Sequence, residues 1–297
     1  MASYSPNTIW RYVRDWIKFT KFQDSLPLCH RANHQHSLAL YVSHLSKQGK
    51  KASSIKTSLS GISWFFKIDG LPDPTKSFVL NRMLIGLKRN QTIPTSRAAP
   101  ITLPILYRLL AALESSPRSR YSKALFEAIF LLAYYGAFRA GELVVSATPK
   151  HTLQLKNVSL KLLKEGWGIK ITLPSYKHSS SQAQILLTPC ASPPCPVGAL
   201  KRYLKLRPPG EGELFILPSS KPVTRSLLAK ELKLCVARAG LNPDLYNTHS
   251  FRAGRTTDLV MTGASESIIR ETGRWKSDGF KAYVRFDVFE LPKASPP

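Results

Sequence analysis

The chain has 297 residues, of which 43% are hydrophobic, so it can bury one large core or two smaller ones, and wholesale disorder is excluded. Its 43 lysine and arginine residues exceed its 18 aspartate and glutamate residues, which gives a formal net charge of +25. Because this excess is spread along the whole chain, it indicates an electropositive surface for a polyanion, with nucleic acid as the first candidate and an anionic membrane surface as the alternative.

Four stretches with helical spacing of apolar residues predict a small helical bundle in residues 1–92. The apolar stripes are Ile9, Val13, Trp16 and Ile17; Leu38, Tyr41, Val42 and Leu45; Ile55, Leu59, Ile62 and Phe66; and Val79, Met83 and Leu87. Basic residues lie between these stripes, and we expect six of them to contact a DNA backbone: Lys50, Lys51, Lys56, Arg82, Lys88 and Arg89. For any one of these side chains, a solvated surface charge is the alternative.

The segment CHRANHQH, residues 29–36, brings one cysteine and three histidines together. It lacks a second pair of ligands at the spacing of a zinc site, so we expect a polar loop without a metal ion. The cysteines at positions 29, 190, 195 and 235 form no disulfide framework for a chain of this length. No apolar run is long enough to span a membrane and the opening residues lack a signal-peptide core, so we expect a soluble intracellular protein.

The segment NQTIPTSRAAPITLP, residues 90–104, breaks the helical pattern and predicts a linker over residues 93–103, with Thr102 as the cap of the next helix. A second domain over residues 104–297 follows, with helices near 103–114, 120–135, 197–206, 225–239, 249–262, 265–271 and 278–285. Strands at 168–173 and 183–188 flank a polar loop. Glycines 240, 263 and 273 stand where C-terminal caps belong. The expected fold is therefore mainly α with a small β-hairpin, in the α+β class.

Two short motifs in this second domain carry paired polar groups. In AFRAGEL, Arg139 and Glu142 stand three residues apart at a helix start, where the carboxylate can hold the guanidinium. In THSFRAG, Thr248 is the expected N-cap, and His249 and Arg252 are expected to share one helix face. An ordinary surface ion pair is the alternative for the first motif, whereas the second predicts an anion site because the helix N-terminus also favours negative charge.

Three further residues extend this set. Lys177 lies in the polar hairpin loop, from which its ammonium group can reach a substrate groove. Trp275 follows a glycine-capped turn, and Tyr283 lies on the expected terminal helix beside the apolar anchors Phe280 and Val284. The alternatives are a solvated lysine, a core tryptophan and a half-buried tyrosine with a satisfied hydroxyl group.

Together these residues favour chemistry on a phosphodiester. The acidic residues are scattered among basic neighbours, unlike the grouped carboxylates of a two-metal nuclease. Two guanidinium groups can instead bind both non-bridging oxygens of one phosphate and stabilise a pentacoordinate transition state. A tyrosine hydroxyl group can then attack phosphorus and form a covalent phosphotyrosine.

In this order, AFRAGEL, a hairpin lysine, HSFR, GRW and a following tyrosine resemble the tyrosine recombinase (phage integrase) superfamily. The resemblance covers essentially the whole chain and is strongest to the eukaryotic recombinases of DIRS-type retrotransposons and Cryptons. It implies a SAM-like helical core-binding domain, a linker and a catalytic domain, which form a C-shaped clamp on double-stranded DNA.

The resemblance also implies a role for each matching position. Arg139 and Arg252 would hold the scissile phosphate, with Glu142 as an accessory group that supports Arg139. Lys177 would protonate the departing 5′ oxygen, and His249 would handle the proton of the attacking tyrosine.

At the end of the chain, Tyr283 would be the nucleophile that forms a 3′-phosphotyrosyl bond. Trp275 stands where many members have histidine, and it would donate a hydrogen bond to a non-bridging oxygen. Lys164 and Lys170 flank the same hairpin as Lys177 and are the alternatives for the general acid.

The implied activity is site-specific recombination that integrates or excises a mobile element, without a metal or nucleotide cofactor, by four subunits on two DNA duplexes in the nucleus. A type IB topoisomerase is an alternative with closely similar chemistry. A domesticated DNA-binding protein that no longer cleaves is another, although a binding protein has no need of the nucleophile.

Overall fold

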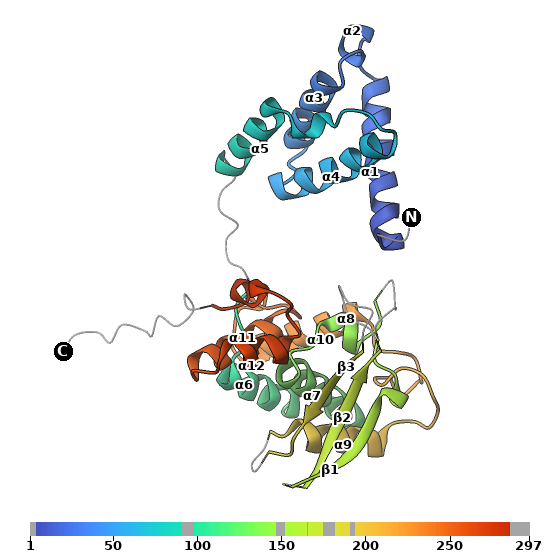
Figure 1. The fold of residues 1–297 in the computed structure, drawn as a ribbon. Helices are drawn as coiled ribbons and strands as arrows, with labels where there is room; N and C mark the ends of the chain where they lie inside the picture. Colours follow the sequence, from blue (N-terminus) through green and yellow to red (C-terminus); the bar gives the residue numbers. More distant parts are fainter. Residues whose placement is uncertain are drawn as a thin grey trace, which may run out of the picture. The chain divides into compact units, whose positions relative to one another are not determined.

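A computed structural model of the chain describes residues 4–90, 98–146, 152–164, 166–174, 182–190 and 194–285. The chain is divided into two compact units, Met1–Thr95 and Ser96–Pro297 (Figure 1). Both units consist mainly of helices, and the second also contains a small antiparallel sheet, so the expected fold class is confirmed. None of the helices in the described ranges is long and apolar enough to cross a membrane.

The first unit is a bundle of helices around one apolar cluster. Its elements are α1 (Pro6–Asp24), α2 (Leu28–Arg31), α3 (His34–Lys47), α4 (Ala52–Ile68), the 3-10 turn η1 (Pro74–Lys76) and α5 (Phe78–Asn90). Most of the expected apolar stripes face the cluster, but two registers were wrong. Ile17 is 46% exposed whereas Phe19 is fully buried, and Val79 is 44% exposed whereas Leu80 is fully buried. Neighbouring apolar residues differ here in which one faces the other helices, and periodicity alone does not distinguish them.

The histidine-rich segment is helical, so the expected polar loop was wrong. Cys29 and His30 lie in α2, and His34 and His36 lie in the first turn of α3. The rings of His30 and His36 stack, with Nδ1 of the first 2.9 Å from Nε2 of the second. Among the described residues, no group of three or more His, Cys, Asp or Glu side chains is arranged to hold a metal ion.

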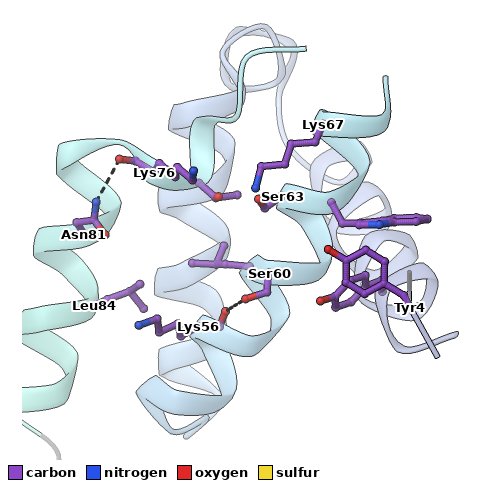
Figure 2. A pocket seen from close by; sticks show the side chains of 12 residues that line it. Tyr4, Lys56, Ser60, Ser63, Lys67, Lys76, Asn81 and Leu84 are labelled. Atoms are coloured by element: carbon purple, nitrogen blue, oxygen red, sulfur yellow. Dashed lines mark hydrogen bonds between the residues drawn. The ribbon is translucent and has the colours of Figure 1, made fainter. Parts of the chain in front are cut away.

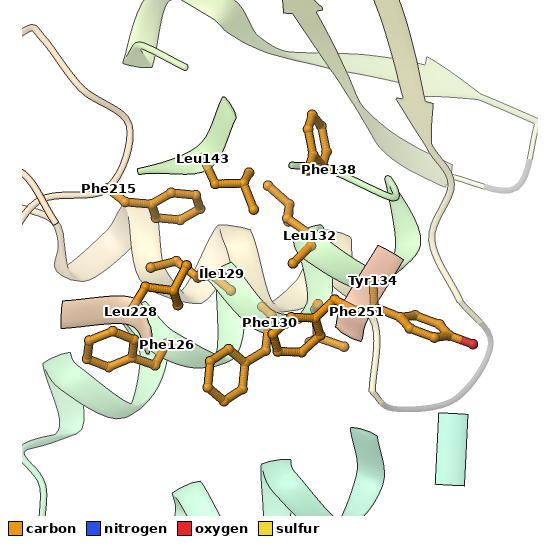
Figure 3. Close-up of a cluster of buried hydrophobic side chains, with 14 of the residues drawn as sticks. Phe126, Ile129, Phe130, Leu132, Tyr134, Phe138, Leu143, Phe215, Leu228 and Phe251 are labelled. Carbon is orange, nitrogen blue, oxygen red and sulfur yellow. The ribbon is translucent and has the colours of Figure 1, made fainter. Parts of the chain in front are cut away.

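The second unit is built around α7 (Arg120–Tyr135), whose residues are buried on almost every side. Such a helix must be surrounded by other elements, and Figure 3 shows apolar side chains from several of them gathered against it. The surrounding elements are α6 (Leu103–Glu114), α8 (Ala140–Leu143), η2 (Leu155–Asn157), α9 (Pro196–Leu206), α10 (Arg225–Arg238), η3 (Pro243–Leu245), α11 (Ser250–Met261), α12 (Glu266–Gly273) and η4 (Asp278–Ala282).

The sheet has three strands in the order β1 (Val158–Leu163), β2 (Gly166–Leu173) and β3 (Ala183–Leu187), all antiparallel (Figure 1). The sequence predicted β2 and β3 and missed β1. In β2, Ile169, Ile171 and Leu173 are fully buried against the core, which produces a clear alternating pattern. The residues of β1 are mostly exposed, so this edge strand carries a much weaker apolar signal.

The segment that enters the second unit is hydrogen-bonded to α11 and to the turn before it. Ile101 N–H donates to the Ser250 carbonyl at 2.9 Å, and Leu103 N–H donates to Asp258 Oδ2 at 2.8 Å. Thr102 is the N-cap of α6 as predicted, but the capping side chain is that of Asp258. A Cβ atom at Gly254 would lie 1.7 Å from the Ile101 carbonyl oxygen, so this close approach requires glycine.

Candidate active site

Arg139 and Glu142 form the predicted ion pair at the start of α8. Arg139 is the N-cap residue, and its backbone N–H donates to Glu142 Oε2 at 2.9 Å. Its Nη1 donates to the other carboxylate oxygen, Oε1, at 3.1 Å. The Glu142 side chain is 4% exposed and that of Arg139 is 20% exposed, so a buried carboxylate orients a guanidinium that still reaches the surface.

Arg252 lies on α11 with its side chain fully buried. Its Nη1 donates to the Ala137 carbonyl at 2.6 Å, and its Nη2 donates to the Gly273 carbonyl. Ala137 follows the C-terminal end of α7, and Gly273 ends α12, where exposed carbonyl groups favour a cation. Two helix ends therefore hold this buried guanidinium in place.

The expected start of the helix that carries Arg252 was wrong by one residue. Helix α11 begins at Ser250, so His249 is its N-cap and is exposed, whereas Arg252 is buried. Thr248, the expected N-cap, lies one residue earlier. The backbone N–H of His249 donates to Asn247 Oδ1 at 2.8 Å, and this contact shapes the turn before the helix. The proton-transfer role of His249 stays a prediction.

Trp275 and Tyr283 lie beside Arg252. The guanidinium carbon of Arg252 is 4.1 Å from the centroid of the Trp275 ring and 5.4 Å from that of Tyr283. The two aromatic rings are 5.3 Å apart. Both side chains are half-buried, and together they cover the cation with aromatic faces.

The backbone around these aromatic residues differs from the prediction. Tyr283 follows the short 3-10 helix η4, not a helix over 278–285, and Phe280 is the buried anchor of this segment. Gly273 has no left-handed backbone; the residue with positive φ after α12 is Arg274, at 56°. Gly273 is needed for space, because a Cβ atom there would lie 1.6 Å from the Trp275 ring.

Sequence reasoning missed Arg274. Its side chain is 6% exposed, and its Nη2 donates to Glu142 Oε2 at 2.8 Å. Its Nη1 donates to the Gly136 carbonyl at 2.9 Å. The only local signal is its place inside the GRW motif, next to Trp275, because nothing in the sequence distinguishes this inward-facing arginine from a solvated one.

The site is strongly electropositive. Burial, together with the neighbouring charges of Arg139 and Arg274, lowers the pKa of Arg252 below its ordinary value. A buried cation beside two like charges gains from the approach of an anion, which offsets both the burial and the repulsion. The positive charge of this cluster therefore favours the binding of an anion beside Arg139, whose guanidinium reaches the surface.

Lys177 lies outside the described residues, so its place relative to this cluster stays a prediction. The two alternatives are described. Lys170 is half-buried on β2, and Lys164 is exposed at the end of the β1 strand.

The six basic residues predicted to contact DNA are all exposed in the first unit. Lys56, Lys67 and Lys76 line a hollow of about 380 Å³ between α4, η1 and α5 (Figure 2). Lys50 lines a second hollow of about 420 Å³, together with Arg11 and Arg14 of α1. The exposed lysines of α4 thus extend into concave basic surfaces, and their contact with DNA stays a prediction.

Comparison with known proteins supports the resemblance. Residues 2–68 match the family described as phage integrase, N-terminal SAM-like domain. The chain is 23% identical to an integrase/recombinase xerD homolog of Selenomonas ruminantium over 295 residues, 93% of this chain and 80% of that protein. It is 25% identical to the tyrosine recombinase XerD of Rhizobium meliloti (strain 1021) over 274 residues, which cover 89% of this chain and 80% of that one.

The fold is similar to that of the Tn1549 transposon integrase in complex with circular intermediate DNA. The TM-score is 0.61 at 13% sequence identity, and the match covers 95% of this chain and 96% of that one. The sequence matches extend over both units. The fold brings residues of the AFRAGEL, HSFR and GRW motifs close to one another. Residues 2–68 therefore match the N-terminal SAM-like domain of phage integrases, and the chain as a whole is similar to tyrosine recombinases in sequence and to a transposon integrase in fold.

Proposed function

We propose that the protein is a site-specific DNA recombinase that cleaves and rejoins strands through a 3′-phosphotyrosine intermediate. The observation that carries this proposal is the cluster around Arg252, whose guanidinium lies against the rings of Trp275 and Tyr283 and is close enough to Arg139 for the two charges to interact. The XerD relatives named above are recombinases, which supports the same activity.

The reaction we propose is a transesterification. The Tyr283 hydroxyl oxygen forms a bond to phosphorus as the bond from phosphorus to the 5′ oxygen breaks. His249 takes the tyrosine proton, and Lys177 gives a proton to the departing 5′ oxygen. Arg139, Arg252 and Trp275 stabilise the charge on the non-bridging oxygens. Attack of a 5′ hydroxyl group from a partner strand reverses these steps, so no external energy source is needed.

The biological setting is a proposal that rests on resemblance. The similar Tn1549 protein is a transposon integrase, which supports a role in integration or excision of a mobile element. The HSFRAG and GRWKSDGFKAYVR segments favour the DIRS-type and Crypton branch, and with it a nuclear protein. Four subunits on two duplexes would exchange the strands in turn.

Covalent capture tests the activity. Wild-type protein, Tyr283→Phe and the control Tyr107→Phe, which alters a tyrosine exposed on α6, would each be incubated with a diverse pool of nicked duplexes. We expect wild type and Tyr107→Phe to form a slow band on a denaturing gel, with DNA attached to the peptide of Tyr283. Equal DNA binding by all three proteins, with no adduct across a well-sampled pool, would favour a non-cleaving DNA-binding protein.

A type IB topoisomerase is distinguished by its products. Such an enzyme would relax supercoiled plasmids of any sequence as a monomer. The proposed recombinase would require its own site and would join strands from two duplexes, so sequencing the captured DNA separates the two activities.

A further inference from the structure

Glu142 is shared between two arginines from distant parts of the chain. Its Oε1 lies 3.1 Å from Nη1 of Arg139, and its Oε2 lies 2.8 Å from Nη2 of Arg274. The side chains of Arg274 and Glu142 are 6% and 4% exposed. Removing either partner of such a buried pair leaves the other charge uncompensated, so the three groups act as one electrostatic unit.

Arg274 reaches this position through an unfavourable backbone conformation. Its φ and ψ are 56° and 44°, the left-handed region that favours glycine. This conformation directs Arg274 toward Glu142 and leaves the next residue, Trp275, against Arg252. Strain of this kind persists only where surrounding contacts hold it in place.

Those contacts use the Arg274 side chain for protein groups rather than for a ligand. Nη1 donates to the Gly136 carbonyl at 2.9 Å, and Nη2 donates to the Ala137 carbonyl at 3.3 Å as well as to Glu142. The same Ala137 carbonyl accepts a hydrogen bond from Arg252. Arg274 therefore connects the carboxylate behind Arg139 with the carbonyl that holds Arg252.

The net charge of these four groups explains how Arg274 can affect strand cleavage. The guanidiniums of Arg139, Arg252 and Arg274 with one carboxylate, that of Glu142, sum to +2 when all are ionised. A phosphodiester carries one negative charge, and attack by tyrosinate raises the charge of the pentacoordinate phosphorus to two. Without Arg274, the carboxylate would face Arg139 alone and cancel the charge that the transition state needs.

We propose that Arg274 is a positioning residue for strand cleavage, an inference that rests on the proposed function. By binding one oxygen of Glu142, it leaves Arg139 charged and directed toward the phosphate. By its place after α12, it also fixes Trp275 against Arg252. Arg274 acts through these residues and does not touch the DNA.

The first test is a double-mutant cycle with Arg274→Gly and Glu142→Gln, measured as single-turnover cleavage of a nicked duplex. Glycine suits the left-handed backbone, so the variant removes the side chain without adding strain. We expect Arg274→Gly to slow cleavage roughly a hundred-fold, as small misplacement of catalytic groups does, with little change in DNA affinity. The double variant should be no slower than Arg274→Gly, because Glu142→Gln removes the charge that Arg274 balances. Effects that multiply would overturn the inference.

A second measurement separates positioning from folding. Added guanidinium ion should restore part of the rate constant of Arg274→Gly, because the glycine leaves a hole beside Glu142. Arg202→Ala is the matched control, since Arg202 pairs with Glu127 at the surface and should neither slow cleavage nor respond to guanidinium. If Arg274→Gly lowers only thermal stability and the active fraction, and the rate constant of the active molecules is unchanged, Arg274 has no positioning role.

A third measurement does not require turnover. Inorganic phosphate should raise the melting temperature of the wild type. Some of this rise should disappear in Arg139→Ala, and that part measures phosphate binding at the candidate site. Arg274→Gly should lose most of that part, because the net charge around the phosphate falls. Failure of the wild type to cleave DNA would reject the proposed function alone, whereas unchanged phosphate binding by Arg274→Gly would reject the role of Arg274.

Discussion

The guanidinium of Arg252 stacks on the indole of Trp275, with its carbon 4.1 Å from the ring centroid. The cation is fully buried, so the aromatic face replaces part of the hydration that it loses. The same indole is the group from which the family resemblance expects a hydrogen bond to the phosphate. These two roles, stacking and hydrogen bonding, can be separated by substitution.

Trp275→Phe keeps an aromatic face on Arg252 and removes the indole N–H. We expect it to lower the free energy of unfolding by about 1 kcal/mol but to slow cleavage roughly a hundred-fold, the cost of one lost transition-state donor. Trp275→Ala loses both roles and should destabilise the protein by about 3 kcal/mol. Thermal unfolding and single-turnover cleavage measure the two effects, and a Trp275→Phe enzyme with full activity would show that the N–H is not used.

The general acid can be identified with a substrate whose 5′ bridging oxygen is replaced by sulfur. A thiolate leaves without protonation, so a variant that lacks only the general acid should cleave this substrate at nearly the wild-type rate. We expect Lys177→Ala to fail on the oxygen substrate and to recover on the sulfur substrate. Lys170→Ala and Lys164→Ala are the matched controls, and recovery by either of them instead would reassign the role.

Gly254→Ala should destabilise the second unit. The added Cβ atom would lie 1.7 Å from the Ile101 carbonyl oxygen, so the backbone of the incoming segment must move. Overpacking of this kind costs about 1–3 kcal/mol or more. Gly198→Ala on α9 is the control, because its nearest contact is 3.5 Å away and glycine is a poor helix former. Chemical denaturation of both variants measures the difference, and equal stability would contradict the close approach.

The salt dependence of DNA binding tests the basic surface of the first unit. Each phosphate contact contributes about 0.9 to the slope of log affinity against log salt. We expect Lys56→Gln to lower the affinity and to reduce this slope by about that amount, because Lys56 lines the basic hollow between α4 and α5. The control is Lys230→Gln on α10 of the second unit, which we expect to leave the slope unchanged. An unchanged slope for Lys56→Gln would make Lys56 an ordinary solvated charge.

Asp73 should make the stability of the first unit dependent on acid pH. Burial raises the pKa of Asp73, but hydrogen bonds from Ser63 and Thr75 outweigh it and hold the pKa below the ordinary 3.8. The unfolded chain therefore takes up its proton first as the pH falls, and the stabilisation is lost through the lower, folded pKa. The difference in melting temperature between wild type and Asp73→Asn should be full above about pH 5 and should shrink as the pH falls below that value. A difference that stays constant to pH 2 would contradict this.

The sequence predicts local features of this protein better than contacts between distant segments. The expected helices 103–114 and 120–135 coincide with α6 and α7, because capping residues and long apolar stretches mark both of them. Arg139 and Glu142 are three residues apart, so one turn of chain brings them together. These features depend on residues that are close together in the sequence, so they can be predicted from the sequence alone.

The contacts of Arg274 depend instead on tertiary packing. Arg274 and Glu142 are 132 positions apart, and they meet only because α12 ends beside the C-terminal end of α7. The expected N-cap of α11 was wrong by one residue, since the helix begins at Ser250 and its N-cap is His249 rather than Thr248.

The hydrogen bonds of residues 99–103 have a mechanical consequence. The Ala99 and Ile101 N–H groups donate to the carbonyls of Leu245 and Ser250, and the chain then enters α6 under the Asp258 side chain. These hydrogen bonds attach residues 99–103 to α11 and to the turn before it at three points. A force on the chain at Ala99 would therefore be transmitted to α11, the helix that carries Arg252.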